Sequence, residues 1–219
     1  MKRILLTGGS GLLGKELRKY YGYLSPSHRE MDITDAGSVK KVINKYKPEL
    51  IVHAAAYTDV SGADKEPDDM AACYLVNVIG TRNIVNCTNQ IPIIYISSEY
   101  VLEPVNFYAL TKLQGEKEIE RAKKYYIIRT LFKPMPFEHP GACTDMWTLG
   151  DYADIIAPLI HKFIQNPKGR LVYIGTGKKT IYELAKRSRP DVKPITRAMI
   201  DVRLPSLDFL EDSLLYRDF

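Results

Sequence analysis

The stretch that decides the fold is residues 1–17, MKRILLTGGSGLLGKEL. The apolar run at residues 4–6 has the composition of a short buried strand, and a helical pattern of apolar residues begins at Leu12. Thr7 opens a turn rich in glycine between the two. The order of strand, glycine turn and helix begins a βαβ unit, so this stretch predicts an α/β protein with a parallel sheet.

The glycines of this turn are spaced as Gly8-x-x-Gly11-x-x-Gly14. In a dinucleotide site, one such glycine makes the tight turn, one lets the backbone approach a pyrophosphate, and one lets the helix pack closely on the strand. The N–H groups at the start of the helix then hold the phosphates. If the three glycines are considered alone, a glycine-rich connection that binds no ligand is an equally good interpretation. Its position directly after a strand favours a nucleotide site.

Strand and helix patterns alternate as far as residue 129. The expected strands are residues 4–6, 23–29 with a break at Pro26, 50–53, 91–96 and 125–129, and the expected helices are residues 12–21, 35–47, 66–88 and 106–122. The predicted fold class is therefore a Rossmann-type, doubly wound parallel sheet over residues 1–130. Residues 131–219 are predicted to form a small, partly irregular C-terminal cap on the substrate side, with helices at 152–164 and from 180 and a strand at 171–174.

Composition limits the classes of function. The net charge of +5 comes from basic residues scattered through 219 residues, so it suits anionic ligands but does not indicate nucleic acid. No apolar stretch reaches a membrane-spanning length. Three cysteines, Cys73, Cys87 and Cys143, lack metal-ligand spacing and are interpreted as reduced thiols. We expect a cytoplasmic protein without a metal site, a membrane contact or a nucleic-acid partner.

Tyr108 and Lys112 are four residues apart on one predicted helix, and Ser98 follows the predicted strand at residues 91–96. A tyrosine hydroxyl titrates near pKa 10, so a neighbouring cation is needed for it to exchange protons near neutrality. Lys112 supplies that cation, and Ser98 can hold a reacting carbonyl oxygen. Tyr-x-x-x-Lys alone also arises by chance on a solvated helix face. Together with the glycine turn, it predicts a site of hydride and proton transfer.

These motifs resemble the extended short-chain dehydrogenase/reductases, and within them the dTDP-4-dehydrorhamnose reductase group. The resemblance rests on TGGSGLLG at residues 7–14, DITD at 32–35, VHAAAYTDV at 52–60, VNVIGTRNIV at 76–85, SSEYV at 97–101 and YALTKLQGE at 108–116. It implies a Rossmann domain with a small C-terminal substrate domain, and a reaction that reduces a 4-keto-6-deoxy sugar nucleotide.

By this likeness the catalytic residues are Ser98, Tyr108 and Lys112, with Glu99 in the place of an acidic neighbour. Asp32 and Ile33 match the adenine side, and Arg129 and Thr130 match the strand end near the nicotinamide. The small residues Ala54, Ala55 and Ala56 follow a strand, where a bulky side chain would collide with a cofactor. The expected cofactor-binding set is Gly8, Gly11, Leu12, Leu13, Gly14, Ser27, Arg29, Asp32, Ile33, Ala54, Ala55, Ala56, Tyr108, Lys112 and Arg129.

Two features depart from the family pattern. Ser98 and Tyr108 are only ten positions apart, where the family usually has a longer loop, and the segment after Arg129 is short. The regulatory subunit of methionine adenosyltransferase is a relative that keeps the fold and serves as a binding partner. Two hypotheses therefore stay open, a compact reductase and a non-catalytic nucleotide-binding interaction protein. The sequence leaves the oligomeric state open, and a homodimer is one possibility.

The end of the second predicted strand bears on cofactor choice. Sites that select NAD usually place an Asp or Glu there, against the ribose 2′-hydroxyl. Residues 23–29 read YLSPSHR and carry no acid. Arg29 can grip a 2′-phosphate bidentately, with Ser27 assisting. An exposed arginine without a ligand is the alternative. The sequence thus predicts NADP(H) as cofactor, with NAD(H) second.

Overall fold

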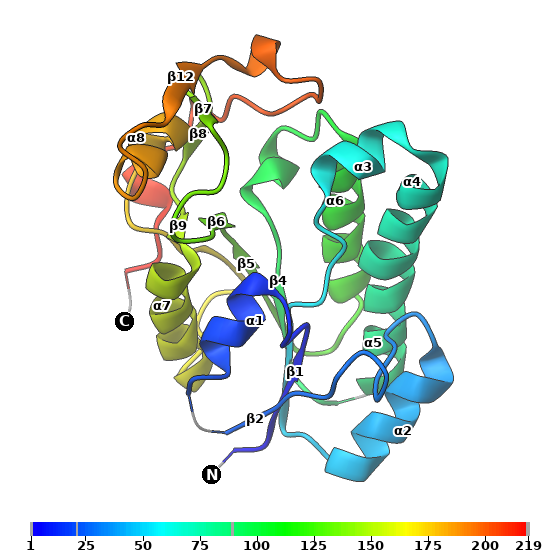
Figure 1. Ribbon diagram of the computed structural model, residues 1–219. Coiled ribbons are helices and arrows are strands. Elements are labelled where there is room, and N and C mark those ends of the chain that lie inside the picture. The colour runs from blue at the N-terminus through cyan, green and yellow to red at the C-terminus, as the bar shows by residue number, and fades with distance from the viewer. Residues whose placement is uncertain (1, 21, 89, 218–219) are drawn as a thin grey trace.

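The computed structural model describes residues 2–20, 22–88 and 90–217. Its centre is a six-stranded sheet in the order β10-β5-β4-β3-β1-β2, in which every neighbouring pair is parallel (Figure 1). This confirms the predicted Rossmann-type fold class. The strands are β1 Ile4–Thr7, β2 Tyr23–Leu24, β3 Leu50–His53, β4 Ile93–Ile96, β5 Tyr125–Arg129 and β10 Leu171–Tyr173.

Helices cover both faces of this sheet (Figure 1). Leu6 packs with α1 and α7 in one core cluster, whereas its neighbour Leu5 packs with α2, α5 and α6 in another. Successive side chains of a strand point to opposite faces, so the near-continuous apolar strands serve two cores. The helices are α1 Leu12–Leu17, α2 Ala36–Tyr46, α3 Val60–Lys65, α4 Pro67–Tyr74, α5 Thr81–Thr88, α6 Phe107–Ile119, α7 Ala153–Gln165 and α8 Ile181–Lys186.

Two helix predictions differ from the structure. The helix predicted over residues 12–21 ends at Leu17, and its predicted end at Tyr21 lies outside the described residues. The helix predicted over 66–88 is divided into α4, a π-helical segment Leu75–Gly80 and α5. The side chain of Asn77, in the π segment, bonds the backbone of Tyr57 and the hydroxyl of Thr111. A π-bulge of this kind is frequent at functional sites.

The tail forms a cap of short strand pairs around a separate apolar core (Figure 1). The pairs are β6 Phe132–Lys133 with β9 Asp151–Tyr152, β7 Gly141–Cys143 with β12 Lys193–Ile195, and β8 Trp147–Thr148 with β11 Lys179–Thr180. The capping box of Thr180 and Glu183 starts α8, as the sequence predicts. Short 3-10 helices lie at Glu99–Leu102, Arg197–Met199 and Asp212–Leu214.

Two tail elements belong to the sheet rather than to the cap. β10 pairs with β5 at the sheet edge, and α7 packs on the face that it shares with α1. The division at residue 130 therefore does not follow the boundary between the two cores. The sequence pattern did not indicate this, because a short edge strand has the same pattern in the central sheet and in the cap.

No helix within residues 2–20, 22–88 and 90–217 has the length and apolar character needed to cross a membrane. Cys73, Cys87 and Cys143 are all free thiols.

Candidate active site

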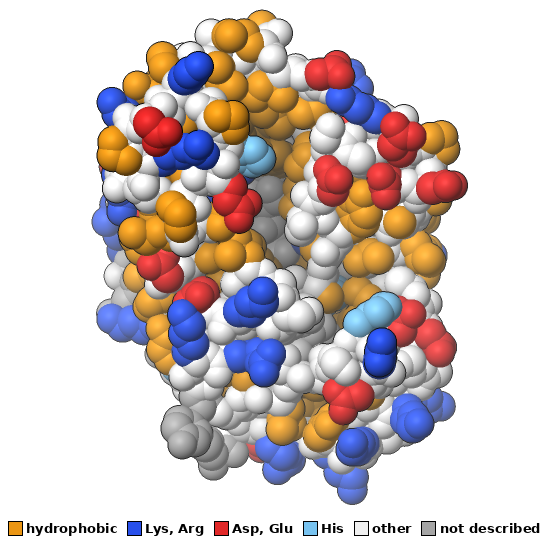
Figure 2. Space-filling model, in the orientation of Figure 1, with side chains coloured by type: hydrophobic (Ala, Val, Ile, Leu, Met, Phe, Trp, Pro, Cys, Tyr) orange, Lys and Arg blue, Asp and Glu red, His pale blue; other side chains and the backbone are white. Residues whose placement is uncertain are grey.

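A cavity of about 620 Å³ lies at the carboxyl ends of the central strands, where the sheet faces the cap. Figure 2 shows the surface hollowed between the cap and the helices on the opposite side. In open α/β sheets, ligands bind at this edge. The cavity brings together these residues of the predicted site: Gly8, Gly11, Leu12, Leu13, Gly14, Asp32, Ile33, Ala54, Ala55, Ala56, Ser98, Tyr108 and Lys112.

The three motif glycines have different physical roles. Gly8 has φ +72°, and a Cβ there would lie 2.5 Å from the Ala55 nitrogen. A Cβ on Gly14 would lie 2.1 Å from the Gly8 oxygen, so Gly14 allows α1 to pack on the turn. A Cβ on Gly11 would meet only the Gly8 oxygen, at 3.2 Å. Gly11 therefore leaves open the space that a larger side chain would take from the cavity.

The loop after β2 presents a polar and an apolar group to the same cavity. The Asp32 carboxylate accepts hydrogen bonds from the Thr34 nitrogen at 2.8 Å and the Thr34 hydroxyl at 2.7 Å. The hydroxyl bond is the main cause that lowers the Asp32 pKa. Ile33 packs against Gly80 of the π segment, where a Cβ would lie 2.7 Å from Ile33 Cδ1. This part of the predicted adenine side is thus held against the π-helical segment Leu75–Gly80.

Three residues of the predicted cofactor set do not line the cavity. Ser27 donates its hydroxyl to Glu30 at 2.9 Å, and both Ser27 and Arg29 are exposed. Arg29 flanks the lining residue His28. Arg129 instead donates to the buried Glu116 carboxylate from Nε at 2.9 Å and Nη2 at 2.7 Å. The expected contact of Arg129 with a cofactor is therefore replaced by a structural ion pair behind the site.

Ser98 and Tyr108 meet at the cavity from different elements. Ser98 follows β4 and accepts a hydrogen bond from the Tyr100 nitrogen at 3.2 Å. Tyr108 lies in the first turn of α6, whose start Asn106 caps by accepting from the Ala109 nitrogen. Burial raises the pKa of Tyr108 to about 12, against a smaller lowering by a hydrogen bond with Ser98. Tyr108 is therefore a neutral phenol near pH 7, which suits a proton donor.

Lys112 is buried one turn further along α6. Its ammonium donates to the Ile96 carbonyl at 2.8 Å and lies 4.2 Å from the centre of the Tyr95 ring. Burial lowers the pKa of Lys112 to about 7, and the charge of Glu116 opposes this shift. That Lys112 lowers the pKa of Tyr108 stays a prediction. Burial is the largest cause of the shift in the Tyr108 pKa.

Sequence reasoning missed Glu116 as part of this site. Its carboxylate accepts from the Ser97 hydroxyl at 2.5 Å and pairs with Arg129, so it joins β4, β5 and α6 directly behind Lys112. The side chain of Glu116 is 3% exposed. The signal available in the sequence was its spacing, because residues 108, 112 and 116 share one helix face.

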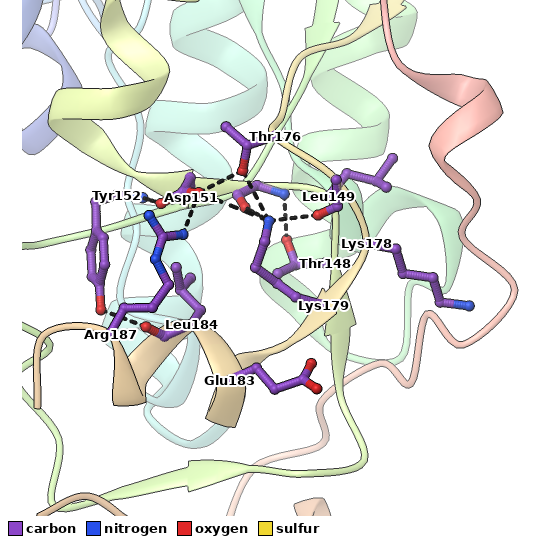
Figure 3. Close-up of polar contacts among 12 residues, drawn as sticks. Thr148, Leu149, Asp151, Tyr152, Thr176, Lys178, Lys179, Glu183, Leu184 and Arg187 are labelled. Atoms are coloured by element: carbon purple, nitrogen blue, oxygen red, sulfur yellow. Dashed lines mark hydrogen bonds and ion pairs between the residues drawn. The ribbon is translucent and has the colours of Figure 1, made fainter. Parts of the chain in front are cut away.

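Glu99 connects the site to the cap. Its buried carboxyl accepts from the Thr148 hydroxyl at 2.6 Å and the Leu149 nitrogen at 3.1 Å. Burial raises the pKa of Glu99 to about 7. Figure 3 shows how the cap side continues as a polar network, in which Asp151 accepts from Arg187 at 2.7 Å and Thr176 at 2.5 Å. The end of β4 is therefore anchored in the cap.

The short segment between Ser98 and Tyr108 is held by the C-terminal segment. Glu103 accepts hydrogen bonds from the Ser206 and Leu207 nitrogens at 2.8 and 3.1 Å. Asn106 donates its side-chain amide to the Arg203 carbonyl at 2.8 Å. The segment that leads from Ser98 to Tyr108 is thus fixed by contacts with residues about a hundred positions away in sequence.

The chain is similar to known proteins over most of its length. It is 25% identical over 237 residues to methionine adenosyltransferase 2 subunit beta of Xenopus tropicalis. This alignment covers 84% of this chain and 70% of that one. It is 28% identical over 189 residues to dTDP-4-dehydrorhamnose reductase of Aggregatibacter actinomycetemcomitans, which covers 76% of this chain and 58% of that one. The chain therefore spans less than two thirds of that reductase.

A solved structure supports the same likeness. The dTDP-4-dehydrorhamnose reductase of Bacillus anthracis str. Ames, in complex with NADP, superposes with a TM-score of 0.81 at 25% identity, covering 94% of this chain and 88% of that one. The model of the family described as RmlD substrate binding domain matches residues 1–132, which is more than half of the chain. The resemblance found in the sequence is confirmed: the chain belongs to the RmlD substrate binding domain family.

Proposed function

We propose that this chain is an NADP(H)-dependent reductase of a 4-keto-6-deoxy sugar nucleotide, similar to dTDP-4-dehydrorhamnose. The observation that carries the proposal is that Ser98 and Tyr108 line the same cavity as the glycine turn. Gly11 lines this cavity without a side chain, which fits a ligand that needs close backbone approach. The likeness to a reductase crystallised with NADP supports this choice of cofactor.

The residues of the site have separate roles in this reaction. The reduced nicotinamide ring, when bound, supplies the hydride to the carbonyl carbon. Tyr108, a neutral phenol near pH 7, gives its proton to the carbonyl oxygen. The Ser98 hydroxyl holds that oxygen by a hydrogen bond and keeps it against the phenol. Lys112, one turn further along α6 in the same cavity, is the cation that we assign to the phenolate that Tyr108 becomes, and solvent later restores the proton.

Cofactor choice rests on the loop after β2, where no carboxylate occupies the strand end. Arg29 is exposed beside His28, and within residues 2–20, 22–88 and 90–217 it forms no ion pair. Its guanidinium is therefore available to a 2′-phosphate. Ser27 already donates to Glu30, so we assign most of the preference for NADP(H) to Arg29.

The test is turnover of dTDP-4-dehydrorhamnose with NADPH, followed by loss of NADPH absorbance. The wild type should consume NADPH only when the keto sugar is present. Lys168→Met, a change in an exposed loop, serves as the control for a surface substitution. No consumption with this substrate or with other 4-keto sugar nucleotides would contradict the proposal.

The alternative is a non-catalytic, nucleotide-binding regulatory protein. It is favoured by the likeness to methionine adenosyltransferase 2 subunit beta, which covers more of this chain than the reductase of A. actinomycetemcomitans does. Inactivity across the substrate panel, together with stable binding to a methionine adenosyltransferase catalytic subunit in sedimentation, would support it. The same sedimentation runs on the chain alone would test whether it forms a homodimer.

A further inference from the structure

Lys133 occupies a place at the cavity that neither the motifs nor the family match accounts for. It is the second residue of β6 and pairs in register with Tyr152 of β9. The preceding residue, Phe132, packs on the core that the sheet shares with α7. Since neighbouring side chains of a strand point to opposite faces, Lys133 points toward the cap, and its ammonium interacts electrostatically with Cys143 of β7.

Lys133 lines the same cavity as Ser98 and Tyr108. The family model ends at residue 132, so Lys133 is the first residue beyond the matched region. It shares the cavity with groups that the proposed reaction uses.

The ammonium of Lys133 lacks a counter-charge. Across residues 2–20, 22–88 and 90–217, no hydrogen bond or ion pair is made by its Nζ. Lys179, the other partly buried lysine of the cap, shows the contrast, because it donates to the Gly150 and Gly177 carbonyls and lies 3.9 Å from an Asp151 oxygen. Glu138 also lines the cavity but is exposed and makes no ion pair with Lys133.

Burial without a partner is unfavourable for this cation. Desolvation lowers the pKa of Lys133, and the charge of the Cys143 thiolate opposes this shift. An unpaired cation that is partly desolvated in a cleft is typical of a site that binds an anion. A bound phosphate oxygen would supply the missing hydrogen bonds and counter-charge.

We propose that Lys133 binds the anionic group of the substrate, which in a sugar nucleotide is the diphosphate. This inference rests on the proposed function for the identity of the substrate, but not for the existence of the anion site. The phosphates of the cofactor are the other source of the same chemistry. The glycine turn is the expected place for those phosphates, so Lys133, on the cap side, is assigned to the substrate.

The experiment measures binding, which does not depend on turnover. Calorimetry gives the dissociation constants of dTDP and of inorganic pyrophosphate for protein saturated with NADPH, and fluorescence gives that of NADPH alone. The variants are Lys133→Met, which keeps side-chain length and suits a partly buried position, and Lys133→Arg, which keeps the charge. Lys168→Met removes one exposed positive charge as the matched control.

The proposal predicts that Lys133→Met weakens dTDP binding by about tenfold or more, as expected for loss of a charge-assisted hydrogen bond. NADPH binding should not change, Lys168→Met should behave as wild type, and Lys133→Arg should keep most of the affinity. Circular dichroism and melting confirm that the variants fold.

Three results would overturn the proposal. They are dTDP affinity unaffected by Lys133→Met, an equal loss of NADPH affinity, and wild type that binds neither dTDP nor pyrophosphate. Failure of the proposed function looks different. Binding of dTDP or pyrophosphate that depends on Lys133, without reduction of any 4-keto sugar nucleotide, supports the anion site and contradicts the reductase.

Discussion

The Glu99 carboxyl accepts a hydrogen bond from the Thr148 hydroxyl at 2.6 Å, and this bond joins the end of β4 to the cap. Both side chains are buried. Burial raises the Glu99 pKa from its ordinary 4.5 to about 7. The cap is therefore attached to the catalytic strand by a group whose charge changes near neutral pH.

The first prediction is that stability falls as pH rises from about 4.5 to about 7. In this range the folded protein keeps a proton on Glu99 that the unfolded chain has lost, so the free energy of unfolding decreases with pH. The expected loss from this group is about 3 kcal/mol. Urea unfolding at several pH values should show a weaker decrease for Glu99→Gln, whereas the exposed control Glu138→Gln should follow wild type. Parallel curves for wild type and Glu99→Gln would contradict the assignment.

The second prediction separates two glycines of the turn. Gly11→Val should abolish binding of NADPH and lower the melting temperature less than Gly14→Val does, because its Cβ would meet the Gly8 oxygen at 3.2 Å and needs only a small shift. Gly14→Val should reduce stability as well, since its Cβ would lie 2.1 Å from the Gly8 oxygen. Calorimetry with NADPH and thermal melting measure both effects. Unaltered NADPH binding by a folded Gly11→Val protein would exclude this turn as the cofactor site.

The third prediction concerns cofactor preference. Wild type should bind NADPH about tenfold or more tightly than NADH, as expected for a charge-assisted contact with the 2′-phosphate. Arg29→Ala should remove most of this preference by weakening NADPH binding alone, and Arg29→Lys should retain part of it. Equal affinity of the wild type for both cofactors, or a preference that Arg29→Ala leaves intact, would rule out Arg29 as the selecting residue.

The fourth prediction assigns Glu116 as a positioning residue behind Lys112. Its charge raises the Lys112 pKa, so Glu116→Gln should move the loss of activity on the alkaline side to lower pH. The variant also leaves the Arg129 guanidinium without its counter-charge, with the Tyr173 hydroxyl as its remaining neutral partner, at a cost of about 3 kcal/mol in unfolding free energy.

The matched control for this prediction is Glu118→Gln. Glu118 lies on the same helix but pairs with Arg82 and Arg121. A stability loss in Glu116→Gln without any change in the pH profile would show that Glu116 has a structural role only.

The sheet could be predicted from the sequence because its strands are apolar runs bounded by glycine, proline and capping residues. The turn at Gly8 and the face shared by Tyr108 and Lys112 were predictable for the same reason, since both depend on local spacing. The helix α3 was not predicted, because residues 60–65, VSGADK, lack an apolar period. The π segment was missed because a single extra residue per turn leaves almost the same pattern.

The parts of the site that depend on distant contacts could not be predicted. Arg129 was expected at the nicotinamide, but it pairs with Glu116, and only the packed structure shows that α6 places this carboxylate beside β5. The burial that controls the pKa of Tyr108 has the same origin. The proposed role of Lys133 could not be predicted either. It depends on burial in the cavity without a counter-charge among the described residues, and only the packed structure shows these surroundings.

The role of Tyr108 as proton donor is tested by the rate of NADPH-dependent reduction of dTDP-4-dehydrorhamnose by wild type and by Tyr108→Phe. Removing the phenol hydroxyl removes the proposed proton donor, so turnover should fall by roughly 10²–10⁴-fold, with the dissociation constant of NADPH and the melting temperature nearly unchanged. Equal turnover by the two proteins would contradict the account, and so would a wild type that binds NADPH but reduces no 4-keto sugar nucleotide.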